Sequence, residues 1–221
     1  MRTKMLLLSA AAVAAGLLSA SAQVYSVNVV GYVNLVTTNQ WTMLNNPLNN
    51  VVAGTTNNTI QGVLSNAPTT SLFYYWTGTG FGNTLKNGAN WLVNRPLAPG
   101  GGGLLKLPGA GPFLYTNVFV GEVLQGNLQV PYVGGGTPSG GYSLISSKVP
   151  QAGTLEVLGL TSNIVGQATL YKWRGTPAGY NTFLKIAAGT SFLGSPTVNV
   201  GEAFILFTTN QGNWNRSFSV Q

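Results

Sequence analysis

The apolar residues of this 221-residue sequence occur in short runs that are separated by Gly, Pro and Asn. The runs are rich in β-branched and aromatic residues, and none keeps the spacing of an amphipathic helix over several turns. Residues 59–64 and 154–160 each predict at most one short helical turn. The sequence therefore predicts an all-β fold of β-sandwich or small-barrel units. The predicted strands are 25–35, 41–44, 71–76, 103–107, 114–123, 143–146, 169–173, 203–208 and 217–220.

Residues 1–22 have the order of a secretory signal peptide. Two basic residues precede an uninterrupted stretch of apolar and small residues at 5–18, and Ala20 and Ala22 suit signal peptidase. The stretch is shorter than the roughly 20 apolar residues of a membrane-spanning helix. We therefore expect export, with the mature chain in the periplasm, at the cell surface or outside the cell, and without a transmembrane helix.

Charged residues make up only 6% of the chain, with ten Lys and Arg against three acidic residues. Arg2 and Lys4 lie in the predicted leader, so eight basic and three acidic residues, about +5, remain after its removal. These cations are scattered and form no stripe that could neutralise successive phosphates. We expect no nucleic-acid partner.

Several motifs recur in the same order at an offset of about 90 to 101 residues, which indicates an internal duplication. The matched segments are 29–33 with 119–123, 41–44 with 142–145, 73–79 with 170–176, 85–86 with 184–185, and 97–105 with 198–206. We place the first β repeat at residues 23–117 and the second at 118–221. Residues 118–123 then close one unit and open the next, and the repeats form either two domains or one fold with a shared sheet.

The sequence contains no His, Cys or Asp. Without imidazole or thiol groups, no Ser-His-Asp or Cys-His nucleophile can be assembled, and zinc and copper sites lose their usual ligands. The glycine runs 100–103 and 134–136 lack the Lys-Ser/Thr pair of a phosphate loop, so we interpret them as turns or linkers. We predict a protein that is not an enzyme and holds no metal or cofactor.

Only Glu122, Glu156 and Glu202 remain as candidates for a pair of catalytic carboxylates, such as glycoside hydrolysis needs. None of them has an acidic counterpart in the other repeat. We interpret them as separate carboxylates at strand ends or in loops.

Two pairs of aromatic residues occupy equivalent places in the repeats: Tyr74 with Trp76, and Tyr171 with Trp173. Residues two apart share one face of a strand. Our first interpretation is that the four side chains are the buried core of each unit, and the alternative is a platform on which sugars stack. Trp91 and Trp214, which lie among Asn and Gly residues, are predicted to be exposed and to be the better candidates for ligand contact.

Residues 23–34, which read Gln-Val-Tyr-Ser-Val-Asn-Val-Val-Gly-Tyr-Val-Asn, resemble a family of uncharacterised secreted proteins of Verrucomicrobia-type bacteria. Other segments resemble the same family, at 46–48, 75–81, 97–100, 119–128, 147–153 and 213–220. The resemblance implies export, a duplicated β fold and no assigned activity. The chain departs from the family at 101–103, where three glycines stand in place of Gly-Glu-Gly.

These observations favour a secreted, non-enzymatic structural protein of the cell surface or extracellular matrix. Residues 25–35 predict an edge strand that pairs either between copies of the chain, in a homo-oligomer or filament, or wholly within its own chain. A carbohydrate-binding or adhesive module for surface glycans is the alternative. An outer-membrane β-barrel is a lesser one, because several predicted strands are apolar on both faces.

The leader generates the first testable prediction. Protein secreted by the native host should begin at Gln23, because the small residues at 20–22 suit the peptidase. Intact-mass measurement checks this. Recovery of the full-length chain from the soluble cytoplasmic fraction would contradict export.

Overall fold

The computed structural model describes residues 29–111, 113–136, 141–175 and 178–220, so the predicted signal peptide lies outside the described residues. Almost all of the regular secondary structure in the described chain is strand, which confirms the predicted all-β class. Its helical elements are the four-residue helix α2 (Ile60–Val63) and the three-residue 3-10 helix η1 (Thr161–Asn163). Thr59 caps α2, because its hydroxyl accepts a hydrogen bond from the Gly62 N–H.

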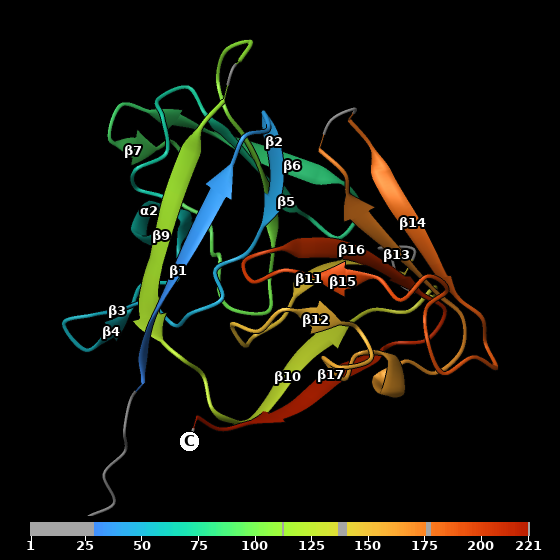
Figure 1. The fold of residues 1–221 in the computed structure, drawn as a ribbon. Helices are drawn as coiled ribbons and strands as arrows, with labels where there is room; N and C mark the ends of the chain where they lie inside the picture. Colours follow the sequence, from blue (N-terminus) through green and yellow to red (C-terminus); the bar gives the residue numbers. More distant parts are fainter. Residues whose placement is uncertain (1–28, 112, 137–140, 176–177, 221) are drawn as a thin grey trace, which may run out of the picture.

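The first half of the chain forms a five-stranded antiparallel sheet and a separate two-stranded ribbon (Figure 1). The order across the sheet is β2 (Trp41–Leu44), β8 (Gly103–Lys106), β5 (Leu72–Trp76), β6 (Phe81–Asn87) and β7 (Asn90–Trp91). The ribbon pairs β1 (Val30–Thr37) with β9 (Tyr115–Glu122). A small hairpin joins β3 (Val51–Val52) to β4 (Thr55–Thr56).

The second half repeats this plan with four strands in its main sheet. The order across the sheet is β11 (Tyr142–Ser146), β16 (Ala203–Thr208), β13 (Ala168–Trp173) and β14 (Tyr180–Lys185). The second ribbon pairs β10 (Gly126–Tyr132) with β17 (Gly212–Phe218), and a short pair joins β12 (Gly153–Thr154) to β15 (Thr197–Val198).

The two halves share one pairing scheme. In each half the first strand pairs with the last one to form the ribbon, and the second strand lies beside the penultimate one in the main sheet. This common scheme supports the duplication, which we keep as a proposal. Because β9 completes the first ribbon, the boundary that we predicted at residue 118 falls inside a strand of the first half. We propose that the second repeat instead opens with β10.

Each half buries its own hydrophobic core between its sheet and its ribbon, and a third cluster joins the halves. Phe73 and Phe119 belong to the first core, and Leu170 and Trp214 belong to the second. The third cluster consists of Met43, Leu104, Leu144 and Ala203, which come from both halves. Strands such as β5 are therefore apolar on both faces because both faces are covered, one by the same half and one by the other half.

Reciprocal backbone hydrogen bonds connect the halves. The Asn45 N–H, after β2, donates to the Gly201 carbonyl just before β16, at 2.9 Å. In the opposite direction the Ser146 N–H, at the end of β11, donates to the Gly100 carbonyl before β8, at 3.0 Å. In each half, therefore, the turn before the penultimate strand binds the end of the other half's second strand.

Gly103 and Gly101 provide a matched test of this packing. A Cβ atom at Gly103 would overlap the ring of the buried Phe73, whereas a Cβ at Gly101 would meet only the Ala98 carbonyl oxygen, at 3.4 Å. Gly103→Ala should lower the free energy of unfolding by about 1–3 kcal/mol, as overpacking does. Gly101→Ala should change it by less than about 1 kcal/mol. Chemical denaturation measures both changes, and equal stabilities of the two variants would contradict the described packing.

Candidate functional site

The four aromatic residues that we predicted to form the core of each repeat are only half-buried. On β5 the fully buried side chain is Phe73, which faces the first core, whereas Tyr74 and Trp76 project toward the other half. Trp173 occupies the same kind of position in the second half, and Tyr171 is half-buried as well. The predicted burial was wrong because alternation shows which residues share a face, but not which face is fully covered.

Trp91 and Trp214 lie in the hydrophobic cores, with 4% and 2% of their surface exposed, so the prediction that they are exposed was wrong. Their indole N–H groups donate to the carbonyls of Leu64 and Leu158, respectively. Exposed Asn neighbours do not indicate an exposed Trp, because alternate residues of a strand point to opposite sides. Asn213 and Asn215 point outward while Trp214 points inward, and Asn90 and Trp91 alternate in the same way. The two tryptophans are therefore not candidates for ligand contact.

Aromatic side chains from both halves line an open cleft of ≈ 360 Å³. The lining residues are Trp76, Phe81, Tyr142, Tyr171, Tyr180 and Ile205. The Trp76 and Phe81 rings meet edge-on with their centres 5.2 Å apart, and the Tyr171 and Tyr180 rings do so at 6.3 Å. Strands β5 and β6 of the first half thus face strands β11, β13, β14 and β16 of the second half across one apolar cleft.

The aromatic cleft contains no Lys, Arg or Glu side chain among its lining residues. Burial raises the pKa of the Tyr171 hydroxyl, and a hydrogen bond with Tyr142 raises it further. Burial also raises the pKa of Tyr180. The cleft is therefore an uncharged surface at neutral pH, with tyrosine hydroxyls as its polar groups.

A second cleft of ≈ 640 Å³ shares the Trp76 wall and adds a cation. The Arg95 guanidinium lies over the Tyr75 ring, 4.2 Å from its centre, and its Nη2 donates to the Tyr75 hydroxyl at 2.7 Å. The Arg95 Nε is buried and has no hydrogen-bond partner among the described residues. Trp76 thus stands between an apolar cleft and one that can donate hydrogen bonds.

A third cleft, of ≈ 510 Å³, lies at the equivalent place in the other half. Trp173 and Arg174 line it where Trp76 and Thr77 line the second cleft, and Met43 takes the place of Leu144. The Trp173 indole N–H donates to the Trp41 carbonyl at 2.9 Å, so this wall of the cleft is anchored to the first half. The shared scheme of the halves therefore produces two related clefts at their junction.

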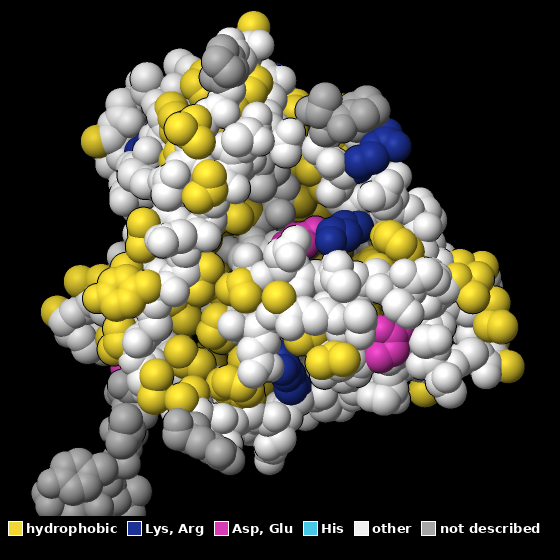
Figure 2. All heavy atoms as spheres, in the orientation of Figure 1, with side chains coloured by type: hydrophobic (Ala, Val, Ile, Leu, Met, Phe, Trp, Pro, Cys, Tyr) yellow, Lys and Arg dark blue, Asp and Glu magenta, His cyan; other side chains and the backbone are white. Residues whose placement is uncertain are grey.

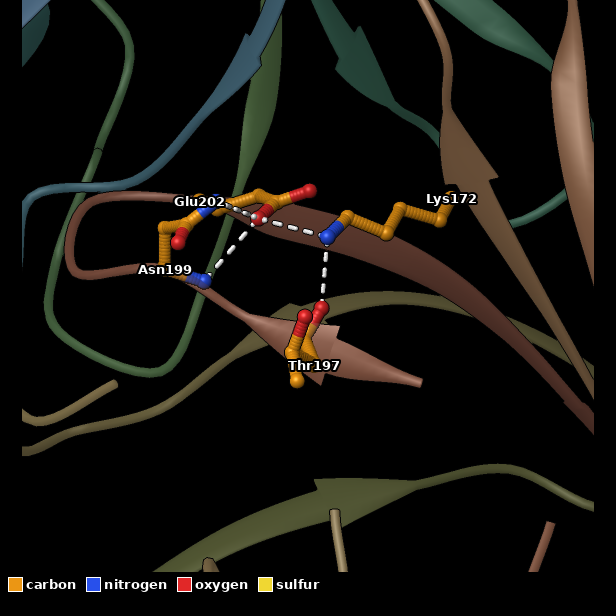
Figure 3. A network of polar contacts seen from close by, with 4 residues as sticks. All are labelled: Lys172, Thr197, Asn199 and Glu202. Carbon is orange, nitrogen blue, oxygen red and sulfur yellow. Dashed lines mark hydrogen bonds and ion pairs between the residues drawn. The ribbon is translucent and has the colours of Figure 1, made fainter. Parts of the chain in front are cut away.

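Glu202 belongs to a polar network beside the third cleft (Figure 3). Its Oε2 accepts hydrogen bonds from the Asn199 N–H at 2.9 Å and side-chain amide at 3.1 Å, and lies 3.2 Å from the Lys172 Nζ. Lys172 also donates to the Thr197 carbonyl. This network holds the turn that presents the Gly201 carbonyl to Asn45, so its evident role is structural.

The other two carboxylates lie in different surroundings. Glu156 accepts a hydrogen bond from the Phe192 N–H at 3.2 Å, and the backbone of Glu122 at the end of β9 pairs with Asn49.

Within the described part of the chain, no three His, Cys, Asp or Glu side chains gather in a group that could hold a metal ion. No described helix is long and apolar enough to cross a membrane.

Comparison with models of protein families, with curated proteins and with solved structures finds no match to this chain. The resemblance to secreted Verrucomicrobia-type proteins therefore stays a prediction.

Four residues of the two clefts around Trp76 were not predicted from the sequence. They come from separate strands and loops: Phe81, Tyr142, Tyr180 and Arg95. One feature of the sequence could have indicated this site. Residues 72–76 place aromatic residues on both faces of one strand, which indicates that a second layer covers it.

The tyrosines of the cleft predict how stability depends on pH. Tyrosines in the unfolded chain ionise near pH 10, while the raised pKa values of Tyr171 and Tyr180 keep them neutral in the folded protein. Their contribution is complete below about pH 9 and is lost as the pH rises through the folded pKa values. The melting temperature should therefore fall above about pH 10, and less steeply in Tyr180→Phe. An identical alkaline fall in wild type and variant would contradict the raised pKa of the partly buried Tyr180.

Proposed function

We propose that this protein is a non-catalytic carbohydrate-binding module that acts after export from the cytoplasm. The observation that carries the proposal is the aromatic cleft at the junction of the halves, lined by Trp76, Phe81, Tyr142, Tyr171 and Tyr180. Ligand sites are typically concave, mostly apolar and supplied with a few placed polar groups. The cleft fits that description.

A neutral sugar chain is the ligand class that suits the chemistry of the cleft. Pyranose rings with equatorial hydroxyls present apolar C–H faces, which pack on aromatic rings. The uncharged wall of the cleft offers no partner to an ionic group, and its tyrosine hydroxyls can bond to sugar hydroxyls. Arg95 in the adjoining cleft adds a donor beyond Trp76, so a ligand several sugars long would meet both surfaces.

The absence of a carboxylate from the cleft supports binding without hydrolysis. Glycoside hydrolysis uses two carboxyl groups on either side of the scissile bond. Glu202 is engaged with Lys172 and Asn199, and Glu156 bonds to the Phe192 backbone. None of the three glutamates lines the aromatic cleft.

Export and a structural role at the cell surface remain proposals from the sequence. A module that binds glycans without cutting them is compatible with both, because it can anchor its chain to a polysaccharide matrix. The low charge of the sequence adds support, since neutral glycans do not need a charged partner.

Isothermal titration with cellohexaose and xylohexaose tests the proposal. Wild type should bind at least one of these neutral oligosaccharides, and Trp76→Ala and Tyr180→Ala should each weaken binding at least about tenfold, or about 1.4 kcal/mol. Tyr32→Ala is the matched control, because Tyr32 is an exposed tyrosine outside the cleft. It should bind as wild type does.

Two outcomes would contradict this proposal. One is the absence of binding to neutral oligosaccharides by a wild-type protein whose fold is confirmed by circular dichroism. The other is binding that survives both cleft variants unchanged, which would place the sugar elsewhere on the protein.

A further inference from the structure

The two ribbons of the molecule present different outer faces. On the β10–β17 ribbon the exposed residues are Asn127, Gln129, Pro131, Asn213, Asn215 and Ser217. On the β1–β9 ribbon most of them are apolar: Val30, Tyr32, Val36, Val118 and Val120. Tyr32 is 73% exposed and Val36 is 58% exposed. Figure 2 shows hydrophobic side chains gathered on the left of the molecule, over β1 and β9.

The hydrogen-bond pattern shows which backbone groups of β1 are unpaired. The Val123 N–H donates to the Val29 carbonyl at 2.7 Å, which marks Val29 and Val123 as a hydrogen-bonded pair. Because bonding alternates along an antiparallel ladder, every second residue after Val29 also faces β9. The residues between them point their N–H and C=O groups away from β9: Val30, Tyr32, Asn34 and Val36.

The opposite edge of the same ribbon is capped. The Asn50 and Asn66 side-chain amides donate to the carbonyls of Val120 and Thr116. The Asn49 backbone pairs with Glu122 at the end of that edge. Of the β9 residues whose backbone groups point away from β1, only Val118 has no hydrogen-bond partner among the described residues.

The second ribbon has one protected position on each edge. Asn163 accepts a hydrogen bond from the outward N–H of Asn215 on β17. On β10, Pro131 occupies an outward position and has no N–H to offer, which is a common protection of edge strands. Within the described residues, the four outward positions of β1 have no such partner, and β1 pairs only with β9.

We propose that the outer edge of β1 pairs with the same edge of a second copy of this chain. Strand Val30–Thr37 carries no charged residue, so two identical edges meet without electrostatic repulsion. The third cleft lies open along Asn34 and Val36, and no described strand pairs with this edge. An edge that presents backbone donors and acceptors needs a partner with the same groups, and β1 of another copy supplies them.

The pairing is antiparallel, with Val33 of both copies on the two-fold axis. This register places Val30 opposite Val36 and Tyr32 opposite Asn34, so that only outward-pointing groups meet. The result is a four-stranded sheet in the order β9, β1, β1 and β9, with a mostly apolar outer face that Asn34 of both copies interrupts near the two-fold axis. Because the contact uses the same edge twice, it closes a dimer and does not propagate into a filament.

Sedimentation equilibrium of the mature chain, purified after export from a bacterial host, tests the proposal. From about 1 µM to about 1 mM protein, the mass should rise from one chain to two and no further. Tyr32→Lys places like charges close to the two-fold axis, and Asn34→Pro removes an outward N–H that the monomer does not use. Each should raise the dissociation constant of the dimer at least tenfold.

Gln129→Lys is the matched control, because it adds the same charge to the exposed face of the other ribbon. It should dimerise as wild type does, and all variants should keep the wild-type circular dichroism spectrum. A strictly monomeric wild type overturns the proposal, whether or not the apolar face binds lipid vesicles or another protein. Masses that grow beyond two chains, or a dimer that neither β1 variant weakens, overturn it as well.

Discussion

The reciprocal contact between the halves is the constraint on which the rest of the structure depends. Each main sheet packs one face on its own core, and its other face would be exposed if the halves were apart. The bonds from Asn45 to Gly201 and from Ser146 to Gly100 bring the second strands of both sheets together, and Met43, Leu104, Leu144 and Ala203 close the seam. The chain contains no cysteine, so burial and backbone pairing must hold the halves together without a disulfide.

The clefts lie where the contact between the two halves is incomplete. The hydrophobic cluster fills its centre, while larger aromatic residues at its margins remain half-covered. Trp76 and Trp173 hold related positions, yet one lies near the uncharged aromatic wall and Arg95, and the other near Glu202 and Arg174. If the halves arose by duplication, they have kept the same strand pairing and now differ in the side chains at the contact between them. The proposed carbohydrate site lies at the cleft where these side chains are aromatic and uncharged.

The ribbons show the same contrast at another surface. They have the same place in the pairing scheme, but β10 carries a proline and polar outward residues, whereas β1 carries mostly valines and a tyrosine there. Along β1, Val33 and Leu35 lie on the half-buried face, and Val30, Tyr32 and Asn34 lie on the exposed face. The sequence predicts an edge strand here, which can pair within its own chain or with another copy. One edge of β1 pairs with β9, and the other edge has no strand partner within the described residues.

The sequence by itself determined the all-β class and the alternation of side chains along the strands, because both follow from local backbone geometry. It also excluded His, Cys and Asp chemistry, since that depends on composition alone. Which face of a strand is covered was decided only by tertiary structure. Tyr74 and Trp76 are half-exposed because the second half covers them incompletely, and Trp91 and Trp214 are buried because their strands turn them inward. Phe81, Tyr142 and Tyr180 are far apart in sequence and become one surface only when the halves pack, since no local pattern records contacts between distant segments.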